Sequence, residues 1–292
     1  MQIGRLGVWN WLDGFSAPEA VEFARRVEAW GYSALWIPEA VGRDPFSLIG
    51  WLSAGTRTLL LATGIANIYA RDAMSMRAIQ QTLAELSNGR LVLGIGVSHE
   101  PLVTSLRGHV YQKPVATMRA YLEAMKKAPY QGPQPAQEAP VVLAALRPKM
   151  LALAAQHARG AHPYFVPPEH TARAREILGR GPWLCPELKV VWETDPSKAR
   201  AVARQAMAIY TSLPNYQNNL RELGFSDADF AGGGSDRLVD AIVAWGDEKA
   251  IRARIRAHHD AGADHVCIQA LRPDGKPGPD LRVLEALAPR AS

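Results

Sequence analysis

The stretch PEAVEFARRVEAWGYSALWIP, residues 18–38, decides the fold class of this chain. Apolar residues recur along its first half at spacings of three and four: Ala20, Phe23, Val27 and Trp30. That spacing draws one apolar stripe on a helix, which Gly31 then ends. Residues 34–37 are apolar at successive positions, as is typical of a parallel strand buried on both faces. The stretch therefore predicts a helix that leads into a buried strand.

The same unit of helix, glycine and buried strand recurs at residues 76–95 and 251–268. Eight strands are expected in all: residues 3–9, 34–37, 59–65, 91–95, 141–145, 161–165, 188–192 and 266–268. Strands that alternate with helices along the whole chain indicate an α/β fold with a parallel sheet. Eight such units in 292 residues predict a single-domain (β/α)8 TIM barrel over residues 1–292.

Two stretches are longer than such a barrel needs, and they follow strands 4 and 7. They cover residues 97–139 and 194–262 and contain turn-rich segments such as PYQGPQP at 129–135 and LPNYQNN at 213–219. Barrel enzymes carry their active-site loops at this end of the strands. We therefore expect the two insertions to contribute to a functional site.

A doubly wound dinucleotide-binding fold is the main competitor. Its phosphate-binding fingerprint needs three glycines after a strand and a carboxylate about 20 residues further on. The best match, GIGVSH at residues 94–99, lacks the third glycine, and Arg119 stands where the carboxylate belongs. The sequence therefore favours the barrel.

Composition excludes several classes of protein. The chain carries 33 Lys and Arg against 28 Asp and Glu, a net charge of +5, without the basic run that would indicate a nucleic-acid partner. Its two cysteines, Cys185 and Cys267, cannot staple a chain of this length. We find neither a signal sequence nor an apolar run of about 18 residues, so we expect a cytoplasmic protein with no membrane partner.

Polar residues that follow the predicted strands are the candidates for a functional site. Glu39 follows the second strand among apolar sequence neighbours, whose burial would raise its pKa. His99 follows the fourth strand, after two glycines that either let backbone approach a ligand or simply form a turn. His162 is equally consistent with a core histidine. No metal-ligand spacing and no nucleophile motif are present, so we expect no metal site and an organic cofactor.

Three segments carry a resemblance to a known family: GYSALWIPE at residues 31–39, ATGIANIYARD at 62–72 and LAELSNGRLVLGIGV at 83–97. Together they resemble the bacterial luciferase-like family, and within it the branch that uses the deazaflavin coenzyme F420. The similarity continues in register at residues 144–150, 160–164 and 261–266, so it covers most of the chain.

The resemblance implies where the cofactor lies. A cis peptide bond between Gly64 and Ile65 would form a bulge that presses on the back of the deazaflavin ring. Further ring-lining positions are implied at Asn67, Gly96, Val97, Ser98 and His99. Positions along the ribityl and phosphate side are implied at Ala145, Gly160, Ala161 and His162.

The resemblance also implies the reaction: hydride transfer between the deazaflavin and an unidentified small organic substrate. The acid after strand 2, Glu39, would lie near the redox carbon. Many relatives carry a histidine directly after that acid, where this chain has Ala40. Glu39 and His99 are therefore the candidate proton donors, with Trp9 and Trp11 as walls of a substrate pocket.

Two other functions stay open. One is a luciferase-like monooxygenase that uses flavin mononucleotide (FMN) instead of F420. The other is a non-catalytic cofactor-binding barrel, since the replacement by Ala40 is what a decayed site would show. Relatives often dimerise, and a homodimer is the assembly that the resemblance allows.

Overall fold

The first predicted helix shows how closely local signals set the elements. In the computed structural model, which describes residues 1–289, helix α1 spans Ala17–Ala29. It begins at Ala17 because Ser16 caps it and Glu19 closes a capping box. Gly31 follows with a φ of +83°, a conformation that glycine adopts without strain. Strand β2 (Ala34–Ile37) comes next and is buried at every position, as predicted.

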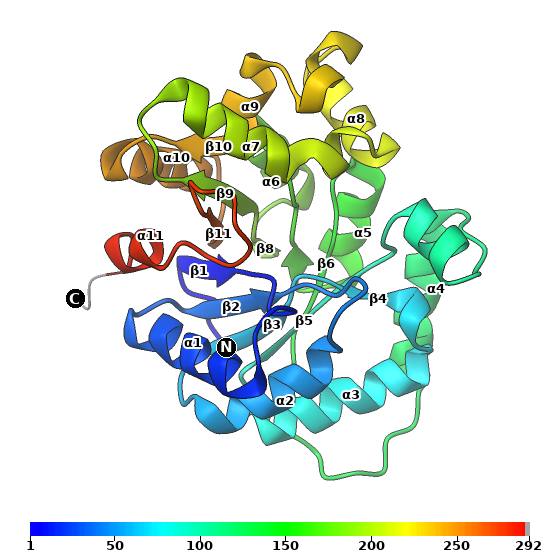
Figure 1. The fold of residues 1–292 in the computed structure, drawn as a ribbon. Helices are drawn as coiled ribbons and strands as arrows, with labels where there is room; N and C mark the ends of the chain where they lie inside the picture. Colours follow the sequence, from blue (N-terminus) through cyan, green and yellow to red (C-terminus); the bar gives the residue numbers. More distant parts are fainter. Residues whose placement is uncertain (290–292) are drawn as a thin grey trace.

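Strands and helices alternate along the chain, as expected for a barrel (Figure 1). The strands are β1 (Leu6–Trp9), β2, β3 (Leu60–Thr63), β4 (Ala66–Asn67), β5 (Leu91–Gly96), β6 (Val141–Leu143), β7 (Gly160–Ala161), β8 (Trp183–Leu184), β9 (Glu187–Val191), β10 (Val243–Trp245) and β11 (Val266–Leu271). The helices are α1, α2 (Pro45–Gly55), α3 (Ala73–Leu86), α4 (Pro114–Lys127), α5 (Pro148–His157), α6 (Pro168–Leu178), α7 (Pro196–Thr211), α8 (Pro214–Arg221), α9 (Asp236–Ile242), α10 (Glu248–Asp260) and α11 (Leu281–Ala286).

The parallel strands close into a (β/α)8 barrel. Their order is β10-β9-β11-β1-β2-β3-β5-β6-β7-β8, with β4 paired to β5. Only Cys185 and Pro186 separate β8 from β9, so these two strands form one interrupted strand at barrel position 7, and β10 is an additional strand beside β9. The amide of Cys185 donates to Ala161 O at 2.9 Å, while Pro186 O accepts from Cys267 N at 3.0 Å. These bonds tie the interrupted strand to both of its neighbours.

Several strand boundaries differ from the predictions. The sixth strand was expected over residues 161–165, but β7 ends at Ala161. Pro163 has no N–H to donate, and Phe165 has a left-handed φ of 62°, so the backbone leaves the sheet there. The third strand is likewise interrupted, between β3 and β4. Strand β10, which lies in the second insertion and pairs with β9, was not expected at all.

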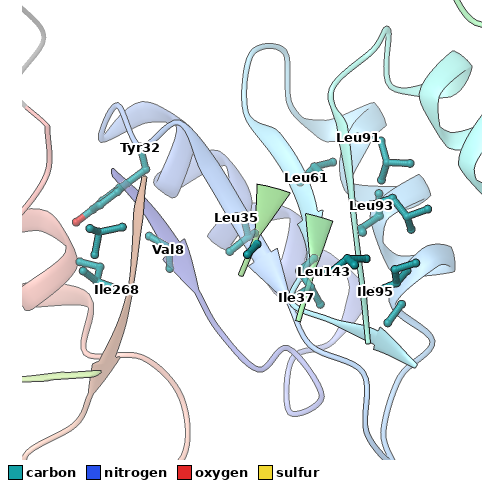
Figure 2. Packing of buried hydrophobic residues seen from close by; sticks show 14 of the residues in the cluster. Val8, Tyr32, Leu35, Ile37, Leu61, Leu91, Leu93, Ile95, Leu143 and Ile268 are labelled. Atoms are coloured by element: carbon teal, nitrogen blue, oxygen red, sulfur yellow. The ribbon is translucent and has the colours of Figure 1, made fainter. Parts of the chain in front are cut away.

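Side chains alternate between two faces of the barrel strands. One face, with Val8, Leu35 and Leu93, packs against the surrounding helices, as Figure 2 shows. The alternate residues Trp9, Trp36 and their neighbours Ala62, Val92 and Val142 form a separate cluster inside the barrel. Strands buried on both faces explain the continuous apolar runs in the sequence.

The insertion after strand 7 forms a layer above the barrel (Figure 1). Helices α7, α8 and α9 share a hydrophobic cluster of their own that includes Met207, Leu220 and Leu238. This cluster also takes in Phe165, just beyond β7, which ties the insertion to the carboxyl ends of the strands. None of the helices within residues 1–289 is long and apolar enough to cross a membrane.

Candidate active site

A cavity of about 1140 Å³ opens at the carboxyl ends of the barrel strands. Its walls come from the residues after the strands, from the start of α4 and α5, and from the α7–α8 insertion. Most of the residues predicted for a site line it: Glu39, Gly64, Ile65, Val97, Ser98, His99, Ala145 and His162. Trp9 and Trp11, predicted as pocket walls, line it as well.

The bulge after β3 has the predicted backbone. The peptide bond between Gly64 and Ile65 is cis, which confirms that expectation. The indole N–H of Trp9 donates to Gly64 O at 2.9 Å, and Gly64 N donates to Ile37 O at 2.8 Å. A Cβ on Gly64 would lie 2.7 Å from Trp9 Nε1, so the close approach of Trp9 requires glycine here.

Glu39 is held as an ion pair at the cavity wall. Arg71 donates to both carboxylate oxygens, at 2.7 Å from Nη2 to Oε1 and 3.0 Å from Nη1 to Oε2. The backbone amide of Asn67 donates to Oε2 at 2.7 Å, and the carboxylate side chain is only 7% exposed. Its neighbours are thus a guanidinium and an amide rather than the apolar groups that its sequence neighbours suggest.

His99 stands on an unusual backbone turn after β5. Ser98, directly before it, has a left-handed φ of 58°. The ring of His99 lies 5.4 Å from that of Tyr216, which comes from α8. Burial lowers the pKa of His99, and the neighbouring Asn215 side chain opposes this shift. Its Nδ1 is buried without a hydrogen-bond partner.

His162 lies at the floor of the cavity. Its ring stacks on Trp36, with centroids 4.5 Å apart and planes 12° apart. Nδ1 lies 2.7 Å from the carbonyl oxygen of Cys185, which can only accept, so Nδ1 carries the proton. Nε2 is then an acceptor, and it is buried without a partner. Burial lowers the pKa of His162 to about 4, so the ring is neutral at pH 7.

Four predicted residues are not among those that line the cavity: Asn67, Gly96, Gly160 and Ala161. Asn67 instead caps the turn at residues 68–70 and donates its amide to Glu39. A Cβ on Gly96 would lie 2.7 Å from Ile65 Cδ1, and one on Gly160 would lie 2.1 Å from Trp183 O. Both glycines are therefore required by strand packing.

The sequence reasoning missed residues that reach the cavity from distant elements. Arg173 comes from α6, Tyr210 from α7, and Asn215, Tyr216 and Glu222 from α8 or its end. The position of the second insertion after strand 7 was the sequence signal for the residues of α7 and α8, and Arg173 had none. Their spacing has no motif because tertiary packing brings them together.

Five cations line the cavity. The cations that line it are Lys113, Arg119, Arg147, Lys149 and Arg173, from the region of α4, α5 and α6. Glu222 bridges two of them: Oε1 lies 2.8 Å from Arg147 Nε, and Oε2 lies 2.8 Å from Arg173 Nη2. Among residues 1–289, no group of three His, Cys, Asp or Glu is placed to hold a metal ion.

Comparison with known proteins now places the chain in a family. Residues 4–265 match the family described as luciferase-like monooxygenase. The chain belongs to the luciferase-like family. A Mycobacterium tuberculosis relative, whose name provisionally describes it as a coenzyme F420-dependent oxidoreductase, is 24% identical over 92% of this chain and 95% of its own. The 5,10-methylenetetrahydromethanopterin reductase of Methanolobus tindarius is 25% identical over 84% of this chain and 87% of its own.

Solved structures show the same fold for this luciferase-like protein. The coenzyme F420-dependent tetrahydromethanopterin reductase from Methanopyrus kandleri matches with a TM-score of 0.77 and 16% identity, over 99% of this chain and 98% of its own. The oxygenating constituent of 3,6-diketocamphane monooxygenase from Pseudomonas putida, in complex with FMN, matches with a TM-score of 0.73 and 15% identity, over 98% and 97%. The matching folds thus include an F420-dependent protein and an FMN-bound one.

Proposed function

We propose that this luciferase-like protein is a coenzyme F420-dependent oxidoreductase that transfers a hydride between the deazaflavin and a small organic substrate. Two relatives that align over most of the chain support this choice: one is described as a coenzyme F420-dependent oxidoreductase and the other as a 5,10-methylenetetrahydromethanopterin reductase. The observation that carries the proposal is the charge of the cavity. Five cations against two carboxylates in the cavity lining suit a cofactor with an anionic side chain.

The residues at the cavity fit a flat ring with polar edges. Gly64 and Ile65 would support its back, because both line the cavity at the bulge after β3. His162 Nε2 is a buried acceptor without a partner, which an N–H or O–H of the cofactor would satisfy. Val97, Ser98 and Ala145 would contact the ring or its side chain. When bound, a deazaflavin supplies two-electron chemistry by accepting or donating a hydride.

His99 is the proton donor or acceptor in this proposal. Its ring lines the cavity, has one unpartnered nitrogen and has a pKa lowered by burial, so at neutral pH it is in the uncharged form that accepts a proton. Both oxygens of Glu39 are already bonded to Arg71. We therefore assign Glu39 a positioning role: it orients the backbone at Asn67, beside the bulge.

An FMN-dependent monooxygenase is the second candidate, because an FMN complex is among the matching folds. A binding titration of the apo protein with oxidised F420 and, separately, with FMN tests the choice. We expect saturable F420 binding that is at least tenfold tighter than FMN binding. A preference for FMN would move the assignment to the monooxygenase. Binding of neither cofactor would favour the non-catalytic barrel.

A further inference from the structure

One side of the cavity is a continuous aromatic surface, here called the aromatic wall and made of Trp9, Trp11, Tyr164, Tyr210 and Tyr216. Ring centroids lie 5.3 Å apart for Trp9 and Trp11, and 5.0 Å apart for Trp9 and Tyr164. Tyr210 lies 5.2 Å from Tyr164 and 5.5 Å from Tyr216. The end of β1, the end of β7 and the α7–α8 insertion thus build one surface.

The wall presents ring faces rather than free polar groups. The hydroxyl of Tyr164 lies 3.0 Å from Gln269 Oε1 and 2.9 Å from the hydroxyl of Tyr210. Because an amide oxygen only accepts, Tyr164 donates to Gln269 and accepts from Tyr210. The indole N–H of Trp9 is bonded to Gly64 O. Three of the five polar groups on the wall, those of Trp9, Tyr164 and Tyr210, are therefore already hydrogen-bonded within the protein.

Among the described residues, no cation that lines the cavity stacks over a ring of the wall. Lys189 Nζ lies 3.8 Å from the centroid of Tyr164, but it is buried, is not among the lining residues and is paired with Glu187 at 3.2 Å. Glu222, which pairs with Arg147 and Arg173, follows Tyr216 by six residues, about 9 Å along the helix. A charged group placed on the ring faces would lose its water, and Lys189 behind them is already paired with Glu187.

Space and shape restrict the ligand further. A volume of about 1140 Å³ exceeds what one ligand commonly fills, roughly 300 to 1,000 Å³, so a second molecule fits beside the cofactor. The planes of Trp9 and Trp11 are 89° apart. Such a corner accepts a flat ring that stacks on one indole and turns its edge to the other.

We propose that the substrate is an uncharged molecule with a planar ring system that binds against the aromatic wall. Its reacting polar group faces His99, which adjoins the wall through Tyr216. This inference rests on the proposed function for the presence of a cofactor beside the wall. The position of Trp11, which is half-buried and lines the cavity, makes it the residue that determines ring selectivity.

Calorimetric titration of the F420-saturated protein with three matched probes tests the inference. The probes are 2-naphthol (planar and neutral at pH 7), 2-naphthoate (planar and anionic) and decahydro-2-naphthol (neutral and not planar). We expect 2-naphthol to bind at least tenfold more tightly than either other probe. Equal or tighter binding of 2-naphthoate or decahydro-2-naphthol, or binding of none, would overturn the inference.

Two variants locate the binding. Trp11→Leu keeps an apolar group but removes the flat face, and we expect it to weaken 2-naphthol about tenfold while F420 affinity stays within threefold. Trp51→Leu, on the exposed face of α2 and not among the cavity residues, is the control and should change neither affinity. Unchanged 2-naphthol binding in Trp11→Leu would also overturn the inference. If no cofactor binds, the proposed function fails, and the same three titrations on the apo protein still decide the wall's selectivity.

Discussion

Arg71 donates two hydrogen bonds, 2.7 and 3.0 Å long, to the two carboxylate oxygens of Glu39, which lies 32 residues earlier in the sequence. The guanidinium also reaches Asp44 at 3.0 Å, so one cation joins two acidic residues at the rim of the cavity. A carboxylate with both oxygens used in this way is suited to positioning neighbours. It is poorly placed to exchange a proton with a substrate.

Glu39→Gln therefore separates positioning from proton transfer. We expect the free energy of unfolding to fall by about 2 kcal/mol, because charge-assisted bonds to Arg71 are lost. Turnover should fall by less than about tenfold, with an unchanged pH profile. A fall of about 10² to 10⁴ together with loss of one limb of the profile would instead mark Glu39 as the proton donor.

His99→Gln should lower turnover by about 10² to 10⁴, since the group that exchanges the proton is removed. Burial lowers the pKa of His99 below 6.5, so in the oxidation direction, where the neutral ring is needed, activity is full at pH 7. It falls as the pH drops through the pKa of His99, and this acid limb should be missing in the variant. Cofactor affinity within threefold of the unmodified protein is the control. Retention of the limb would assign the proton to another group.

Arg173→Gln should weaken F420 binding about tenfold and reduce its salt dependence, because one of the two arginines bridged by Glu222 is lost. Glu222→Gln should instead strengthen F420 binding, since it removes a carboxylate that competes with the cofactor for both arginines. Arg221→Gln is the matched control: Arg221 directly precedes Glu222 in the sequence, pairs with Asp227 and is not among the residues that line the cavity. Equal effects of Arg221→Gln and Arg173→Gln would remove the anion site from the proposal.

Gly160→Ala tests whether this glycine packs the barrel or contacts the cofactor. The added Cβ would meet Trp183 O at 2.1 Å, so strands β7 and β8 must separate. We expect thermal or urea unfolding to show a loss of at least about 2 kcal/mol, with cofactor affinity of the folded protein unchanged. Gly14→Ala, at an exposed position with nothing within 4 Å of the added Cβ, should be neutral. Normal stability with weakened cofactor binding would restore the ligand-binding role.

Buried histidines should make the fold sensitive to acid. Burial lowers the pKa of His162 to about 4 and those of His258 and His265 to about 3, from 6.5. The unfolded chain therefore takes up protons first, and stability present above pH 6.5 is lost as the pH falls toward these values. Each ring contributes about 2 kcal/mol of this loss between pH 6.5 and 5.

Denaturant unfolding of His258→Gln at pH 7 and pH 5 checks the effect. The difference in stability between the two pH values should shrink by about 2 kcal/mol relative to the unmodified protein. His109→Gln, at an exposed position, should leave that difference unchanged. An unaltered difference in His258→Gln would show that this ring is not titrated by unfolding.

The sequence alone determined the elements whose signals are local. A stripe of apolar residues and a terminating glycine specified α1, and runs of apolar residues buried on both faces specified β2 and β5. Alternation of such units sufficed to predict the barrel. The motif around Gly64 also marked the cis bulge, because its resemblance to the family extends over contiguous residues.

Only the tertiary structure decided which side chains meet. Glu39 is hydrogen-bonded to Arg71, and Tyr164 is hydrogen-bonded to Gln269, 105 residues away, and no local pattern encodes these contacts. The same holds for Gly160, which the family resemblance assigned to the cofactor and which the structure packs against Trp183 O. The physical reason is that a local conformation follows from neighbouring residues, whereas a site depends on where loops from different strand ends converge.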